Sequence, residues 1–412
     1  MLLDAYVLQI SQLVMSDLLF IALLFAAAGV LAWRPRPGLG AVAAAGALLA
    51  AAVSVRTVGQ PVIVAGLAYV LLAGAGVGAG AGAGAGRGPG PGRGPGRGPG
   101  CGPGRCRCRG QEKGDGGVGS GLRRRLVAAG TMAGAFVLVL GGYMVWSVQS
   151  YGEWGMGTSH TRVMYARAAT FADCVTLDLP VYQRPLCPRV PAGQRPGVDA
   201  YMWSTSSPAY HYRPPAGMSK DVVLADFAWR VFTQQPLGLA REAATDFLRG
   251  FVPVKADMPG QVPIKRWQFQ TAYPQTGVRD GTPENVAERF GGGLPQVDTR
   301  LATLLRAYQL GPGHVPGTVV GVCLLLGLLG AVGVGRARHS PLRSACLLFA
   351  ATGASVLLIA AIFQFSWRYQ LPGIVILPVA GALGVTALFH RRKETPPAAP
   401  APAPDLATTS RR

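Results

Sequence analysis

Residues 344–365 read SACLLFAATGASVLLIAAIFQF, a run without a charged side chain. One helix of this length can cross a bilayer, because the hydrocarbon core requires about 20 apolar residues. Six other stretches are similarly apolar, although the second is short and rich in alanine. The candidate spans are residues 13–33, 38–55, 61–82, 126–148, 315–335, 344–365 and 371–390. The sequence therefore predicts an all-α polytopic membrane protein with about seven transmembrane helices.

The composition agrees with this class of protein. Half of the 412 residues are hydrophobic, and only 14% are charged. Soluble globular domains carry about 25% charged residues. The low charge content therefore excludes an ordinary soluble enzyme and indicates a cell-membrane, multi-pass location.

Basic residues predict the orientation of the helices. Arg34 and Arg36 follow the first span, and residues 87–125 contain ten basic and two acidic residues. Three arginines lie within residues 336–343, and residues 390–393 read HRRK. All four clusters fall on one side if the helices alternate, and basic loops favour the cytoplasmic side.

This topology divides the chain into six parts and places the N-terminus outside. No signal peptide is recognisable in residues 1–12, so we expect that upstream helices are missing from this chain. The six parts are a three-helix membrane segment (1–82), a disordered cytoplasmic loop (83–125), a transmembrane helix (126–148), a mainly helical extracytoplasmic domain (149–314), three transmembrane helices (315–390) and a disordered cytoplasmic tail (391–412).

The predicted loop consists largely of glycine, proline and arginine, which bury little apolar surface. Its Arg-Gly content is similar to RNA-binding tracts, but it has no aromatic residue on which a base could stack. We therefore expect no nucleic-acid partner and a loose attraction to lipid headgroups. Three cysteines without a fourth ligand make a poor zinc site: Cys101, Cys106 and Cys108.

The predicted outer domain contains two amphipathic helical patterns that meet at Pro236. They can lie along the membrane surface or pack on each other within a small domain, and the sequence does not favour either arrangement. Cys174 and Cys187 are the cysteines of this segment, and its compartment is oxidising. Twelve residues lie between them, so we expect a disulfide.

Common catalytic motifs are absent from the sequence. It contains no Gly-x-Ser-x-Gly, His-Glu-x-x-His, Walker or Cys-x-x-Cys motif. The five histidines are scattered, so no metal site is predicted from the residues themselves.

A few charged residues at the predicted outer ends of the spans are candidates for a site. Asp17, Arg56 and Arg368 all map to this side, and Trp367 and Tyr369 flank the last of them. An ionisable group at a membrane face is costly unless it is paired or hydrated, so it often has a function. The alternative is that the arginines extend to the interface as isolated residues.

Four stretches resemble polytopic GT-C glycosyltransferases, in particular family 39 protein mannosyltransferases and aminoarabinose transferases. Each motif is short, but their order and their predicted side agree with that family. The outer segment is also similar to actinobacterial membrane proteins of the family 39 type. The stretches are MSDLLF at 15–20, the predicted hairpin at 38–69, the outer segment at 165–174 and WRYQLP at 367–372.

The resemblance implies a transferase that takes a sugar from a polyprenyl-phosphate donor at the outer membrane face. It implies that Arg56 and Arg368 hold the donor phosphate, with Asp17, Trp367 and Tyr369 in support. The family's catalytic Asp lies in an earlier outer loop that this chain lacks, so no catalytic residue is assigned, and a divalent metal is possible only by resemblance. The alternative is a non-catalytic scaffold or degenerate relative whose outer domain binds a partner.

Overall fold

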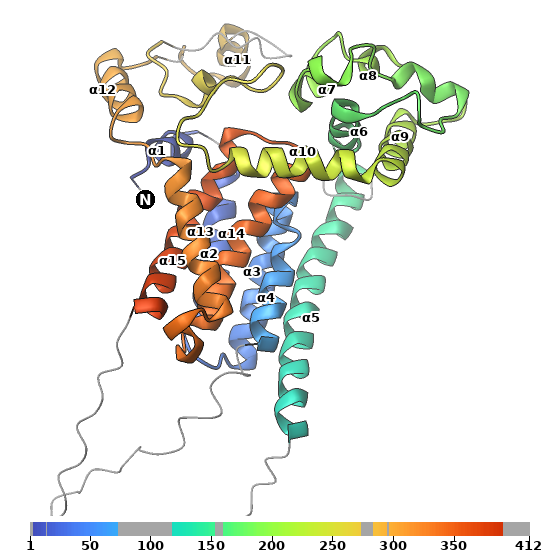
Figure 1. Ribbon diagram of the computed structural model, residues 1–412. Coiled ribbons are helices and arrows are strands. Elements are labelled where there is room, and N and C mark those ends of the chain that lie inside the picture. Colours follow the sequence, from blue (N-terminus) through green and yellow to red (C-terminus); the bar gives the residue numbers. More distant parts are fainter. Residues whose placement is uncertain are drawn as a thin grey trace, which may run out of the picture.

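The computed structural model describes residues 3–13, 15–72, 118–152, 160–272, 283–294 and 296–389. Within these ranges the chain forms helices and connecting segments, with no strand. Figure 1 shows a bundle of upright helices with shorter helices gathered at one end of it. The predicted all-α class is therefore confirmed for the described part of the chain.

The bundle is built from the predicted apolar stretches, each of which contains one helix. Three segments are long and apolar enough to cross a membrane: Gly121–Tyr151, Arg343–Phe363 and Trp367–Phe389. The other four helices are apolar but shorter. The bundle helices are α2 (Asp17–Ala32), α3 (Leu39–Val55), α4 (Val62–Leu72), α5 (Val118–Tyr151), α13 (Gly317–Val332), α14 (Arg343–Phe363) and α15 (Leu371–Phe389).

The two ends of the bundle differ in the residues and helices that they carry. The domain end carries the shorter helices, and the arginine end carries Arg36, Arg124, Arg125 and Arg343. The helices of the domain end are α1 (Ala5–Ser11), α6 (His160–Phe171), α7 (Val198–Trp203), α8 (Pro208–His211), α9 (Lys220–Gln234), α10 (Pro236–Arg249), α11 (Pro283–Phe290) and α12 (Thr299–Leu310). Short 3-10 turns are η1 (Thr57–Gly59), η2 (Val181–Leu186), η3 (Ala192–Gln194), η4 (Ile264–Trp267), η5 (Gly335–His339) and η6 (Trp367–Gln370).

Helices α13 and α15 pack closely through small residues. A Cβ atom added at Gly327 would lie 2.8 Å from the Cβ atom of Ala380, and one at Gly381 would lie 2.9 Å from Cys323. Small residues let two membrane helices approach closely enough to gain van der Waals contact. This contact fixes α15, whose first turn follows the segment that contains Arg368.

Helix α5 contacts the bundle along one narrow face. The fully buried side chain of Met132 lies between α3 and α4, where it meets Gly66, while its backbone lies against Gly46. Much of the remaining surface is apolar and exposed, including Val137 and Leu138. An exposed apolar helix surface of this extent suits contact with lipid tails.

The two helices joined at Pro236 do not share one arrangement: one packs within the small domain, and the other lies across the end of the bundle. Helix α9 buries Leu224 and Phe227 against α6, inside the small domain. Helix α10 instead lies across the end of the bundle, as Figure 1 shows, and contacts α14. The structure also pairs Cys174 with Cys187, whose Cα atoms are 6.1 Å apart, as expected.

A buried arginine joins the domain to the bundle. Arg167 of α6 is 1% exposed, and its Nη2 lies 2.6 Å from Oδ2 of Asp246 in α10. The same guanidinium donates to the carbonyls of Ala361 at 2.8 Å and Phe363 at 3.3 Å. These carbonyls end α14, where a helix lacks internal partners and favours a cation. Arg167 therefore fixes the domain on the bundle.

Several predicted boundaries are wrong. The span predicted at 126–148 begins at Val118, so residues 118–125 of the predicted disordered loop are helical. Arginine is a good helix former, and Arg123, Arg124 and Arg125 extend the helix beyond its apolar part. The first span begins at Asp17 rather than at residue 13. The cysteines at 101, 106 and 108, most of the predicted loop and the predicted tail lie outside the described residues.

Candidate functional site

Three predicted residues meet at the domain end, around the carboxylate of Asp17. This side chain is only 2% exposed. Its Oδ1 accepts a hydrogen bond from Nη1 of Arg56. Its Oδ2 accepts a hydrogen bond from Nε of Arg368 at 2.8 Å, and Nη2 of the same guanidinium forms an ion pair with this oxygen at 2.6 Å. The structure therefore brings together residues from distant parts of the sequence, in hydrogen bonds strengthened by charge.

The positions of these residues follow from the ends of three helices. Asp17 is the first residue of α2, where the helix dipole favours a negative charge. Arg56 is the residue at which α3 ends, and its extended backbone turns the chain toward η1. Arg368 lies in η6, directly before α15. Each residue lies at the same end because its helix begins or ends there.

Aromatic rings hold the two guanidinium groups. The Cζ atom of Arg56 lies 4.9 Å from the ring centroid of Tyr369, within the range of a cation–π interaction. The Cζ atom of Arg368 lies 5.5 Å from the ring of Trp267. Sequence reasoning did not single out Trp267, because nothing in its local pattern connects η4 with the distant η6.

Trp367 is placed differently from the other predicted residues. Its ring is buried and packs edge-on against Phe365, with the ring centroids 5.1 Å apart. Its Nε1 donates to the carbonyl of Ala256 at 3.2 Å. Trp367 therefore anchors η6 to the segment after α10, while the rings found against the two guanidinium groups in the described structure are those of Tyr369 and Trp267.

A cavity of about 860 Å³ adjoins the cluster. This volume is within the range of small-molecule sites, about 300–1,000 Å³. The wall combines cations, amides and aromatic rings, which suits a ligand with an anionic group and hydroxyls. Its polar and aromatic lining includes Gln9, Asp199, Trp203, Lys265, Arg266, Trp267, Gln270, Gln364, Arg368 and Tyr369.

Asp199 is the one carboxylate among the described residues that line this cavity. Its Oδ2 accepts from the backbone N–H of Val262 at 3.0 Å, and its Oδ1 accepts from Nε2 of Gln364 at 2.5 Å. Burial raises the pKa of Asp199, although these hydrogen bonds and the charge of Arg266 act in the opposite direction. A carboxylate with a raised pKa and a fixed orientation can accept a proton. Sequence reasoning missed Asp199 because no motif surrounds it.

The described residues offer little for a metal ion. In the ranges that the structure covers, no three His, Cys, Asp or Glu side chains come together. Asp17 has both of its oxygens occupied by guanidinium groups. The divalent metal that the resemblance allows therefore has no set of three such donors in this part of the chain.

The electrostatics of the site favour an anion. Two arginines share the single negative charge of Asp17, so the cluster keeps one positive charge. Lys265 and Arg266 add two more cations to the cavity wall. Planar guanidinium groups suit phosphate, because they can donate two parallel hydrogen bonds.

Comparisons with known proteins do not identify this chain. No protein-family model, no curated protein and no solved structure matches it. The similarity to GT-C glycosyltransferases therefore rests on the short sequence motifs, and the geometry of the domain end is the independent basis for a functional proposal.

Proposed function

We propose that this protein is a GT-C-like membrane glycosyltransferase, which transfers a sugar from a polyprenyl-phosphate donor at the outer membrane face. The observation that carries the proposal is the cationic cluster of Arg56 and Arg368 on Asp17, beside a cavity of about 860 Å³. The chain resembles the carboxyl-terminal two thirds of that family's pattern.

The proposal includes a seven-span topology, with the domain end outside and the arginine end in the cytoplasm. Four of the bundle helices are shorter than a usual span, and α2 has 16 residues. Such a helix is about 24 Å long, whereas the hydrocarbon core measures about 30 Å. Local bilayer thinning and flanking residues compensate for a mismatch of this size. The positive-inside pattern supports the same orientation.

Donor binding would use the arginine cluster at headgroup depth. The phosphate of a polyprenyl-phosphate sugar sits at the membrane surface, while its chain remains in lipid. Arg368 lines the cavity and its guanidinium group is held in place by Asp17. In this arrangement, Arg368 and Arg56 bind the phosphate and stabilise it as the leaving group.

Asp199 supplies the proton acceptor that the reaction needs. An acceptor hydroxyl attacks the anomeric carbon of the sugar, and the bond from that carbon to the phosphate oxygen breaks. Asp199 takes the hydroxyl proton, and the polyprenyl phosphate leaves as an anion. The raised pKa of Asp199 supports this role, because a base is more effective when its pKa is nearer to the working pH.

Donor binding is the experiment that tests the proposal. The purified protein in nanodiscs is titrated with a polyprenyl phosphate, for the wild type and for Arg368→Gln. We expect a loss of affinity of about tenfold or more, since hydrogen bonds to charged groups contribute about 1.5–3 kcal/mol. Arg241→Gln is the control, because Arg241 is exposed on α10 and lies outside the cavity lining. Equal affinity in all three proteins would overturn the proposal.

A non-catalytic scaffold is the second candidate, and one observation favours it. The Asp17 cluster ties α2, α3 and η6 together, as a purely structural ion-pair network would. In that case Arg368→Gln lowers the unfolding temperature, and the wild-type protein has no measurable affinity for polyprenyl phosphate. The same titration therefore distinguishes the two candidates.

A further inference from the structure

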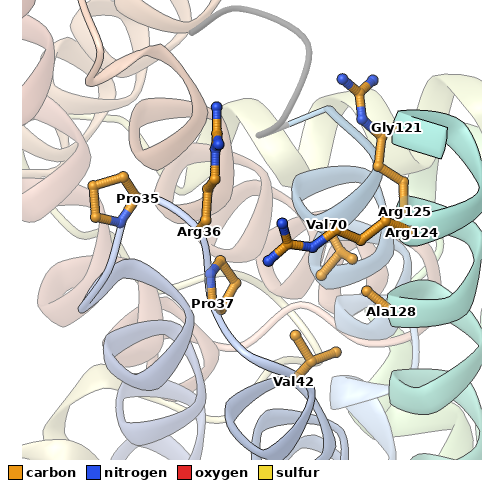
Figure 2. A pocket seen from close by; sticks show the side chains of 9 residues that line it. All are labelled: Pro35, Arg36, Pro37, Val42, Val70, Gly121, Arg124, Arg125 and Ala128. Atoms are coloured by element: carbon orange, nitrogen blue, oxygen red, sulfur yellow. The ribbon is translucent and has the colours of Figure 1, made fainter. Parts of the chain in front are cut away.

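Three arginines border a pocket at the arginine end, far from the cluster described above. Arg36 belongs to the segment between α2 and α3, whereas Arg124 and Arg125 belong to α5. Figure 2 shows Arg36 on one side of the pocket and the two α5 arginines on the other. The pocket has a volume of about 230 Å³. This is enough space for a small anionic group.

The walls of this pocket differ from its rim. Val42 of α3, Val70 of α4 and Ala128 of α5 line its apolar part. The N–H of Nη1 of Arg125 points to the carbonyl of Leu71, at 3.5 Å. The pocket therefore has cations at the end of the bundle and apolar side chains toward the middle of the bundle.

The charges at this end are uncompensated within the described chain. The described ranges 18–72, 118–152 and 299–389 contain no Asp or Glu, and they hold α12 and all of the bundle except Asp17 at the domain end. Within these ranges no carboxylate is available to Arg36, Arg124 or Arg125. An anion from outside the described chain would be attracted to the point where the three guanidinium groups gather.

The surface around the pocket indicates the source of the anion. Large apolar residues within two positions of the lining residues in the sequence are exposed, with Trp33 84%, Leu72 54% and Leu122 57% exposed. Trp residues are enriched at membrane interfaces, and basic pockets between membrane helices bind anionic headgroups. A soluble phosphate ion would make no use of this apolar surface, whereas the acyl chains of a lipid would cover it.

We propose that the pocket between Arg36, Arg124 and Arg125 binds the phosphate headgroup of an anionic phospholipid in the membrane leaflet at the arginine end. The arginines contact the phosphate, and the acyl chains extend along the exposed faces of α4 and α5. This site would hold α5 against α3 and α4 near the end of the helix. The proposal requires that the bundle crosses a bilayer, and it is independent of the reaction proposed for the domain end.

Native mass spectrometry of the purified full chain tests the site. The protein is exchanged into nanodiscs of phosphatidylcholine with 10% cardiolipin or phosphatidylglycerol, and lipid retained after gas-phase release is counted. The test variant is Arg36→Gln, Arg124→Gln, Arg125→Gln. The matched control is Arg34→Gln, Arg123→Gln, Arg336→Gln, which removes the same charge from exposed positions at the same end. We expect at least a fivefold loss of retained anionic lipid in the test variant, and retention close to wild type in the control.

Two outcomes would overturn the site. Equal losses in the two triple variants would indicate unspecific attraction to the basic surface. Displacement of the lipid by 10 mM inorganic phosphate would indicate a site for a soluble anion. Arg36→Gln alone keeps the proposal testable if the triple variant fails to fold, because no hydrogen bond of the Arg36 side chain is found in the described structure. This single variant should retain less cardiolipin than Arg34→Gln, and equal retention would contradict the site.

Discussion

At the scale of the residue, the contacts of Arg167 lead us to expect a large loss of stability when its side chain is removed. It is nearly fully buried, pairs with Asp246 and satisfies two terminal carbonyls of α14. Removing one partner of a buried pair costs about 3–5 kcal/mol when the other charge is left unpaired. Asp246 keeps a second partner, because Nη1 of Arg249 lies 2.6 Å from its Oδ1. We therefore expect Arg167→Ala to lower the free energy of unfolding by about 2–3 kcal/mol, mainly through the carbonyls of α14 that lose their donor, measured by denaturation in detergent.

The exposed Arg241→Ala on α10 is the control for this variant, and it should change stability by less than about 0.5 kcal/mol. The variant Arg167→Met with Asp246→Leu should recover part of the loss, since apolar replacement of both partners removes the buried charge and leaves the half-exposed Arg249 to solvent. An Arg167→Ala protein as stable as the wild type would contradict the assigned anchoring role.

The burial of Lys255 leads us to expect that the stability of the protein depends on pH. Its Nζ lies 3.6 Å from the ring centroid of Tyr6, and no hydrogen-bond partner for it is found among the described residues. Burial lowers the pKa of Lys255 to about 8, and the nearby negative charge of Asp4 opposes this change. The protonated form is therefore disfavoured in the folded protein relative to the unfolded chain.

The sign of the effect follows from proton counting. Between pH 8 and about pH 10 the unfolded chain holds a proton on this lysine that the folded protein releases, so Lys255 makes stability rise with pH. Lys255→Met should raise stability at pH 7 by up to about 3 kcal/mol, because each unit by which the pKa is lowered corresponds to about 1.4 kcal/mol. It should also flatten the rise of stability between pH 8 and pH 9.5. Parallel melting curves at several pH values measure this. The interpretation fails if both proteins show the same pH dependence.

The sequence predicted part of the residue-scale site. The ends of apolar runs gave the depth of Asp17, Arg56 and Arg368, because each helix has a known rise per residue. Their lateral contact depends on the order of helices around the bundle, which hydropathy does not encode. Arg167 and Asp199 were missed for a related reason. A buried charged residue carries the same local signal as an exposed one until its partners from distant elements are known.

At the scale of the element, the contact of α13 with α15 depends on glycine. A Cβ atom added at Gly384 would collide with the backbone carbonyl of Leu326 and lie 2.9 Å from the backbone nitrogen of Gly327. Backbone atoms cannot rotate away as a side chain does, so α15 would have to shift. We expect Gly384→Ala to destabilise the protein by about 1–3 kcal/mol, measured by thermal unfolding in detergent.

Gly29→Ala in α2 is the matched control. No atom lies within 4 Å of a Cβ atom added there. Alanine is favoured over glycine in a helix by up to about 1 kcal/mol, so this variant should be neutral or slightly more stable. If both substitutions changed stability in the same direction, helix propensity rather than packing would explain the result.

The sequence predicted the elements better than their ends. Each apolar stretch contains a bundle helix. In a long apolar run, a helix both buries the side chains and satisfies the backbone hydrogen bonds within the segment. The error at α5 arose because Arg123, Arg124 and Arg125 were assigned to the loop by their charge. Charge ends an apolar run without ending a helix, and the helix begins at Val118.

At the scale of the whole molecule, the charges of the two ends differ strongly. Every acidic residue in the described ranges lies within residues 4–17 or 173–298, and these residues belong to the domain end. The arginines at positions 34, 36, 123–125, 336, 338 and 343 lie at the opposite end without acidic neighbours in those ranges. A polytopic protein with this distribution is expected to insert with the arginine end in the cytoplasm.

Labelling of single cysteines tests the orientation. The background replaces the cysteines at 101, 106, 108, 323 and 346 with serine or alanine and keeps the Cys174–Cys187 disulfide. Ala192→Cys introduces a thiol at an exposed position of the domain end, and His339→Cys introduces one at an exposed position of the arginine end. In intact cells, a membrane-impermeant maleimide should label the first thiol and leave the second unlabelled. Both thiols should react after permeabilisation, which shows that each is accessible.

The reverse labelling pattern in intact cells would contradict the proposed function. It would place the cationic cluster and its cavity on the cytoplasmic side, where an outer-face reaction cannot occur.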